Sequence, residues 1–164
     1  MSFRLLRSSF APLIASTLLF AAPRAGAQAP SDLMVIAQGG AVAPDHPIAV
    51  VILDSLGTGV YCGIDPPDRL TLDCSAQTAL ILTGTDLDSI WSAAITNGFF
   101  GLDSVYVDTT LAGGTWAELE ISGGGQANKV FARNLAVPGF DAVLIAINSV
   151  LPPANRILTN ETLP

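Results

Sequence analysis

The sequence has few of the residues from which proteins build metal and catalytic sites. Its 164 residues include one His and two Cys, and Lys plus Arg number 7 against 14 Asp plus Glu. Without a cluster of Cys and His there is no zinc-binding motif. The net charge of −7 disfavours nucleic acid, because phosphate binding depends on clusters of cations. We therefore predict no metal, no cofactor and no nucleic-acid partner.

Hydrophobic residues are abundant, at 50% of the chain, which excludes an intrinsically disordered protein. At the start, Arg4 and Arg7 precede an apolar run over 11–22, and the small residues Ala25-Gly26-Ala27 follow. This pattern is typical of a secretory signal peptide cleaved after Ala27. No later run is long and apolar enough to span a bilayer. We expect a secreted or periplasmic protein without stable membrane association after cleavage.

Two cysteines flank the loop Asp65-Pro66-Pro67-Asp68. Because an exported protein enters an oxidising compartment, Cys62 and Cys74 are predicted to form a disulfide. A bridge across so short a loop would stabilise the fold by about 2–3 kcal/mol.

The remaining pattern predicts an α+β fold with a mainly antiparallel sheet of about five or six strands and both helices on one face. We predict a signal peptide over 1–27, an extended lead-in over 28–47, a single domain over 48–153 and a C-terminal tail over 154–164. Within the lead-in, only 33–37 is expected as a short strand. Apolar runs bounded by Gly and Pro predict strands near 48–54, 60–64, 69–74 and 78–83.

Helical spacing of apolar residues predicts helices at about 86–97 and 138–150. Thr85 is expected to cap the first helix, and Pro138 suits the first position of the second. The expected buried stripes are Leu87, Ile90, Trp91, Ala94, Ile95 and Phe99 in the first helix, and Phe140, Val143, Leu144, Ile147 and Leu151 in the second.

Between the helices, the segment TWAELEISGGGQANKVFARNL predicts a β-hairpin. A turn centred on Gly124 and Gly125 sets Glu120 opposite Lys129, Glu118 opposite Phe131, and Trp116 opposite Arg133. This register gathers these six residues on one face. Trp, Phe and Arg are typical anchors of protein interfaces, so Trp116, Phe131 and Arg133 are the candidate binding residues, and a protein is the expected partner.

Other motifs favour structural roles over catalysis. His46 lies between prolines without a nucleophile motif nearby, which is typical of a surface loop. Asp54-Ser55-Leu56-Gly57 departs from the Asp-Thr/Ser-Gly loop of aspartic proteases at Leu56, so a strand end followed by a turn fits better. No run matches a calcium-binding loop, and the scattered aspartates suit caps and turns. We assign no catalytic and no metal-binding residue.

Residues 87–151 contain, in order, Trp91, the triplet Gly98-Phe99-Phe100, Tyr106, the hairpin, and a helix that begins at Val137-Pro138. This pattern resembles small bacterial domains of unknown function and is similar to emfourin-type metalloprotease inhibitors. The resemblance implies an α+β fold, and it carries over no catalytic or inhibitory motif.

Together these features predict an exported, non-enzymatic binding module, with inhibition of an extracellular enzyme as one role. A small carboxylate-dependent hydrolase and a structural component of the cell envelope are the alternatives, because a pair of acids distant in sequence leaves no motif.

The export expectation is tested at the N-terminus. We expect protein recovered from the exported fraction to begin at Gln28, because Ala25 and Ala27 place small residues at the −3 and −1 positions of the cleavage site. N-terminal sequencing measures this directly. Exported protein that still begins at Met1 would contradict it.

Overall fold

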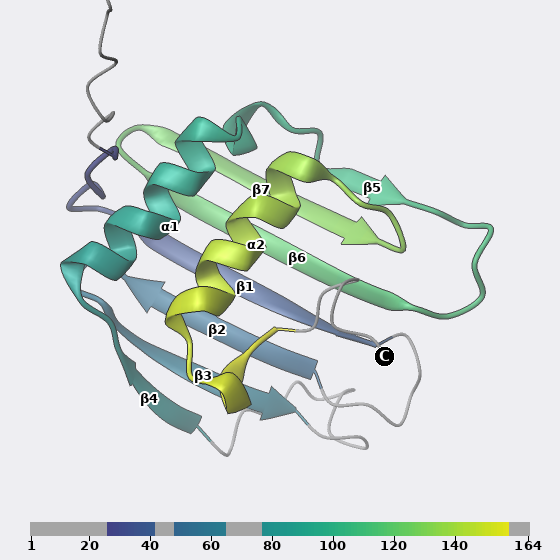
Figure 1. The fold of residues 1–164 in the computed structure, drawn as a ribbon, viewed down its shortest axis with the longest axis horizontal. Helices are drawn as coiled ribbons and strands as arrows, with labels where there is room; N and C mark the ends of the chain where they lie inside the picture. The colour runs from purple at the N-terminus through teal and green to yellow at the C-terminus, as the bar shows by residue number, and fades with distance from the viewer. Residues whose placement is uncertain (1–25, 42–47, 65–76, 158–164) are drawn as a thin grey trace, which may run out of the picture.

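A computed structural model describes residues 26–41, 48–64 and 77–157. These residues form one mixed seven-stranded sheet with two helices, and both helices cover the same face of the sheet (Figure 1). The α+β class and the placement of both helices on one face are confirmed. The sheet has more strands than expected, and one of its pairings is parallel.

The strand order is β4-β3-β2-β1-β6-β7-β5, and every neighbouring pair except β5 and β7 is antiparallel. The strands are β1 (Met34–Ala41), β2 (Ile48–Asp54), β3 (Thr58–Ile64), β4 (Gln77–Ile81), β5 (Val105–Val107), β6 (Thr115–Gly123) and β7 (Gln126–Arg133). The strand expected near 69–74 lies outside the described residues. The expected strand at 78–83 corresponds to β4, which ends earlier because the cap of the next helix begins at Thr83.

The main correction concerns the lead-in. Residues 34–41 form β1, which lies in the middle of the sheet between β2 and β6. The sequence predicted at most a short strand at 33–37 here, whereas β1 continues through Gly39, which close packing requires. A Cβ there would lie 2.7 Å from Cγ2 of Ile157 and 2.9 Å from the Trp116 carbonyl oxygen. The lead-in therefore contributes a central strand.

The first helix, α1 (Gly84–Thr96), begins two residues earlier than its expected cap implies. Thr83 is the N-cap: its hydroxyl accepts from the Asp86 N–H at 3.2 Å, and the Asp86 carboxylate accepts from the Thr83 N–H at 2.8 Å. This reciprocal pair is a capping box. Asp86 lies three residues after Thr83, the spacing at which its carboxylate can accept from the Thr83 N–H. The helix therefore starts after Thr83, and Thr85 lies inside it.

The second helix, α2 (Pro138–Val150), has the expected bounds and buries its predicted face. In α1 the predicted stripe is also buried, except that Ile95 is 38% exposed. Phe99, the last residue of that predicted stripe, lies after α1 in the short 3-10 helix η2 (Phe99–Gly101) and is completely buried. Both stripes pack on the helix-side residues of the sheet in one core, which includes Val35, Val51 and Leu119. None of the helices in the described part of the chain is long and apolar enough to cross a membrane.

The start of the predicted tail also belongs to the core. A short 3-10 helix, η3 (Pro153–Asn155), leads to Ile157, which is 1% exposed. The Asn148 side chain on α2 holds this segment, because it donates to the Ile157 carbonyl at 2.9 Å and accepts from the Ile157 N–H at 2.8 Å. The domain therefore extends at least to residue 157.

The two threonines at the start of α1 distinguish the observed cap from the expected one. We expect Thr83→Ala to lower the free energy of unfolding by about 1 kcal/mol, since it removes the N-cap acceptor. Thr85→Ala, the matched control, is expected to change it by less than about 0.5 kcal/mol. Urea denaturation of both variants gives the two values. A larger loss in Thr85→Ala would contradict the cap at Thr83.

Candidate functional site

The β6–β7 hairpin presents the predicted binding residues in the predicted register. Trp116 lies opposite Arg133, Glu118 opposite Phe131 and Glu120 opposite Lys129. Gly124 and Gly125 form a two-residue turn with φ of 55° and 75°, the left-handed conformation that a tight hairpin turn of this kind requires. The two glycines therefore set the register.

These six residues lie on the face of the sheet opposite to the helices, which we call the open face. The residues that alternate with them along β6 and β7 point to the other face and are buried in the core under the helices: Ala117, Leu119, Val130 and Ala132. Trp116 and Phe131 stack with ring centroids 6.0 Å apart and an interplanar angle of 25°. The ring contact of Trp116 is thus with Phe131, diagonally across the hairpin, although Arg133 is its cross-strand neighbour.

Strand β5 extends this surface in a way that the sequence analysis missed. Val105 pairs with Phe131 and Val107 with Arg133, in parallel. The two valines are 61% and 37% exposed. The triplet Val105-Tyr106-Val107 has high strand propensity, and this is the sequence feature from which the strand could have been predicted. Its short length and its pairing with β7 depend on the tertiary structure.

Arg133 is the unusual polar residue of this surface. Its Nε atom is buried and has no hydrogen-bond partner, and none of the ion pairs among the described residues includes Arg133. Buried donors are normally satisfied, because an unpaired one loses its hydration without compensation. The guanidinium therefore has an unused donor beside the aromatic pair.

Lys129, in contrast, forms ion pairs with two glutamates. Its Nζ lies 2.9 Å from Oε1 of Glu118 and 3.6 Å from Oε2 of Glu120. The hydrogen bond and the charge of Glu118 raise the pKa of Lys129 above its usual value, and Glu120 adds to this. Glu118 also accepts from Nε2 of Gln38 on β1, at 2.7 Å. The two glutamates are thus bridged by a cation and are not arranged as an isolated acid pair.

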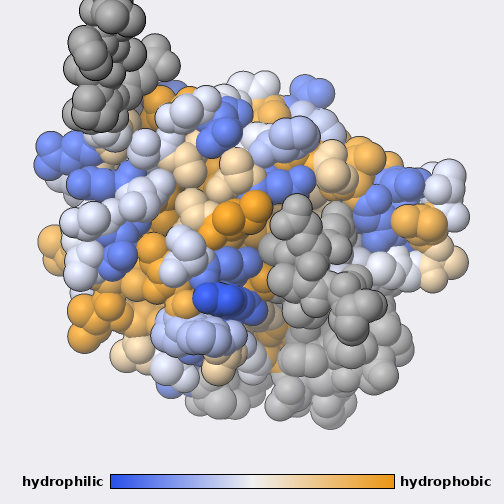
Figure 2. All heavy atoms as spheres, viewed as in Figure 1, coloured by the Kyte–Doolittle hydropathy of each residue, from blue (hydrophilic) through white to orange (hydrophobic). Residues whose placement is uncertain are grey.

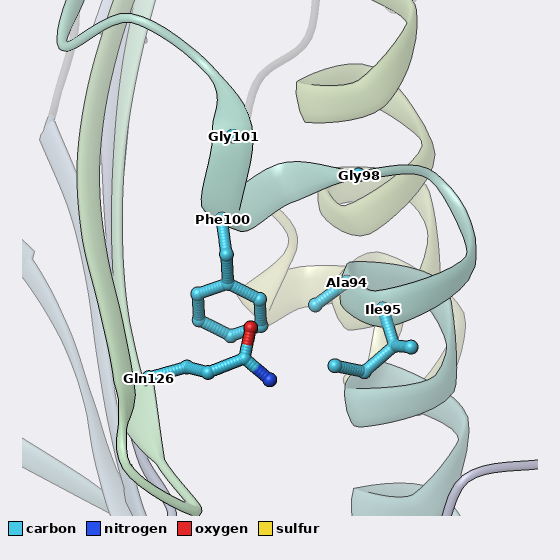
Figure 3. A pocket seen from close by; sticks show the side chains of 6 residues that line it. All are labelled: Ala94, Ile95, Gly98, Phe100, Gly101 and Gln126. Atoms are coloured by element: carbon cyan, nitrogen blue, oxygen red, sulfur yellow. The ribbon is translucent and has the colours of Figure 1, made fainter.

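A second feature is a cavity of about 470 Å³ between the end of α1 and the hairpin (Figure 3). It is lined by Ala94, Ile95, Gly98, Phe100, Gly101 and Gln126. In Figure 3 the Phe100 ring and the Gln126 amide lie side by side and face α1. None of these residues titrates, so this open pocket offers no acid or base.

The remaining candidates have structural roles or lie outside the described residues. Asp54 ends β2 and accepts from the N–H groups of Leu56 and Thr58, which confirms the strand end and turn. The Thr110 hydroxyl and N–H lower the pKa of Asp108 by hydrogen bonding to it. No group of three potential metal ligands occurs among residues 26–41, 48–64 and 77–157.

Three predictions concern residues outside the described part of the chain. The signal peptide lies mostly in 1–25, and His46 and Cys74 also lie outside the described residues. Cys62 is 1% exposed, in a small cluster with Ile48 and Ile64. The bridge between Cys62 and Cys74 stays a prediction.

No protein-family model matches the chain, and no curated protein sequence matches it.

Proposed function

We propose that this protein is an exported binding module that recognises another protein through a surface on the open face. The surface, called the hairpin patch, consists of Trp116, Phe131, Arg133, Val105 and Val107. It combines stacked aromatic rings, exposed valines and a cation on adjacent strands. This composition matches the core of protein interfaces, where aromatic residues and Arg are enriched.

Arg133 carries this proposal. A partner carboxylate would accept from the terminal N–H groups of the guanidinium in the bidentate geometry that Arg favours, and a rotation of the side chain would bring the buried Nε–H into the same contact. Binding would thereby satisfy a donor that is desolvated in the unbound protein. We therefore propose that the partner presents an Asp, a Glu or a C-terminal carboxylate beside an apolar side chain, which would pack on Trp116 and Phe131.

The scaffold supports an inhibitory role, in which a rigid surface occupies an enzyme. The patch is carried by strands whose other face is fully packed against the helices, so little ordering is needed on binding, and preorganisation increases affinity. The target would be an extracellular enzyme.

Export is part of the proposal and is compatible with the packing at the predicted new N-terminus. The Ala29 N–H donates to Oδ1 of Asp88 on α1 at 2.7 Å, and Ala29 packs against the core. Cleavage after Ala27 would leave both contacts in place. The new N-terminal ammonium would be on Gln28, the residue before Ala29, and would therefore lie near the Asp88 carboxylate, whose negative charge would attract it.

The hairpin patch is tested by a matched pair of arginines. Mature protein is immobilised and exposed to the exported fraction of its own source, and captured proteins are quantified by mass spectrometry. We expect Arg133→Gln and Trp116→Ala each to weaken binding of a specific partner by about thirtyfold, corresponding to a hot-spot loss near 2 kcal/mol, and to reduce its capture accordingly. Arg156→Gln, at an exposed arginine on another segment, should leave capture unchanged.

Thermal unfolding of the same variants separates binding from folding. Trp116 also packs against the small cluster of Ile48, Cys62 and Ile64, so we expect Trp116→Ala to lose some stability. Arg133→Gln changes a half-buried polar side chain, so we expect it to stay folded, and it carries the test. Folded variants that keep every partner of the wild type would rule out the hairpin patch as the binding surface.

A further inference from the structure

The edge strand β4 has a row of unpaired backbone groups. The Leu82 N–H donates to the Gly57 carbonyl at 2.8 Å, and the pairing continues with Leu80 opposite Gly59. Because hydrogen bonding alternates along an antiparallel strand, the N–H and C=O groups of Gln77, Ala79 and Ile81 point away from β3. β4 is the last strand of the sheet on that side (Figure 1), and no partner for these groups occurs among the described residues.

This edge lacks the features that normally prevent strands from pairing between molecules. Edge strands are usually protected by charges, proline or very short length. β4 has five residues, Gln77–Ile81, without a charge or a proline. Ile81 is 87% exposed, and Leu56 in the adjacent turn is 83% exposed. Figure 2 shows hydrophobic residues gathered at the lower left, where Figure 1 places β4.

The opposite edge is protected. β5 has only three residues, and Asp103 and Asp108 flank it closely. A two-fold axis brings the same surface of both copies together, so pairing through β5 would place carboxylates near carboxylates. Pairing through β4 places neutral residues on neutral residues. In a chain with a net charge of −7, this is the edge at which like-charge repulsion opposes self-association least.

We propose that β4 pairs antiparallel with β4 of a second copy, about a two-fold axis at Ala79. This register sets Ala79 opposite the second Ala79, and each Gln77 opposite the other copy's Ile81. The outward groups of all three residues are then used, in about six N–H···O bonds. The two sheets become continuous, and each exposed Ile81 lies against the neighbouring chain.

The proposed dimer is independent of the proposed binding function. The hairpin patch lies on β5, β6 and β7, at the other end of the strand order. Pairing through β4 leaves both patches accessible, at the two ends of a continuous sheet. A partner with two binding sites would then bind with a gain in avidity.

Two substitutions at Ala79 test the proposal, with mature protein studied by sedimentation velocity over a range of concentrations. Ala79→Lys would place two ammonium groups directly opposite each other across the axis. Ala79→Pro would remove the central outward N–H without affecting a bond to β3. Ala127→Lys is the matched control, because Ala127 is an exposed alanine on the open face of β7, away from β4.

We expect wild type and Ala127→Lys to dimerise with similar affinity, and both Ala79 variants to dimerise at least about tenfold more weakly. Circular dichroism and thermal unfolding establish that each variant is folded, and Ala79→Lys serves as the test if the proline variant does not fold. A wild type that is monomeric at about 1 mM, a concentration at which even a weak dimer would form, overturns the proposal. Dimerisation that is unchanged in folded Ala79→Lys also overturns it.

Discussion

The pairing of β1 with β2 on one side and β6 on the other holds the sheet together. β2 follows β1 closely in the chain, whereas β6 comes after α1 and β5. Val35 and Ala37 on β1 are completely buried, and burying a valine side chain contributes about 1.5–3 kcal/mol. Without β1, the N-terminal strands and the hairpin would have no common neighbour, and the helices would have no continuous surface to cover.

This arrangement also determines where binding can occur. Both helices lie over one face, so the apolar residues on the helix side of the hairpin are buried, whereas its residues on the open face are exposed or only partly buried. Glu118, Glu120 and Lys129 neutralise one another on that face. Arg133 is left beside the Trp116–Phe131 stack with a donor unused. The proposed function follows from this contrast between paired and unpaired charges on a single hairpin.

The sequence was most informative where a local pattern repeats. Helical spacing predicted both helices, and the glycine turn predicted the hairpin register, because each depends on neighbouring residues. Only a short strand at 33–37 was predicted where β1 lies, because the prolines and the Gly pair of the lead-in gave little pattern. The approach of Ile157 explains why glycine is needed at position 39. The cap was placed at Thr85 instead of Thr83, since both threonines precede the same apolar stripe. At the site, alternation identified Trp116, Phe131 and Arg133, but the valines of β5 and the buried Nε depend on tertiary contacts.

Native-state hydrogen exchange of the mature protein tests the central position of β1 most directly. Amides of a strand that is paired on both sides open only with global unfolding, whereas those at edges open locally. The structure predicts that the amides of Val35–Gln38 exchange as slowly as the slowest amides of β6, and those of β4 and β5 much faster. Fast exchange along β1, with α1 and the hairpin still protected, would show that residues 34–41 are a peripheral lead-in and would contradict this account.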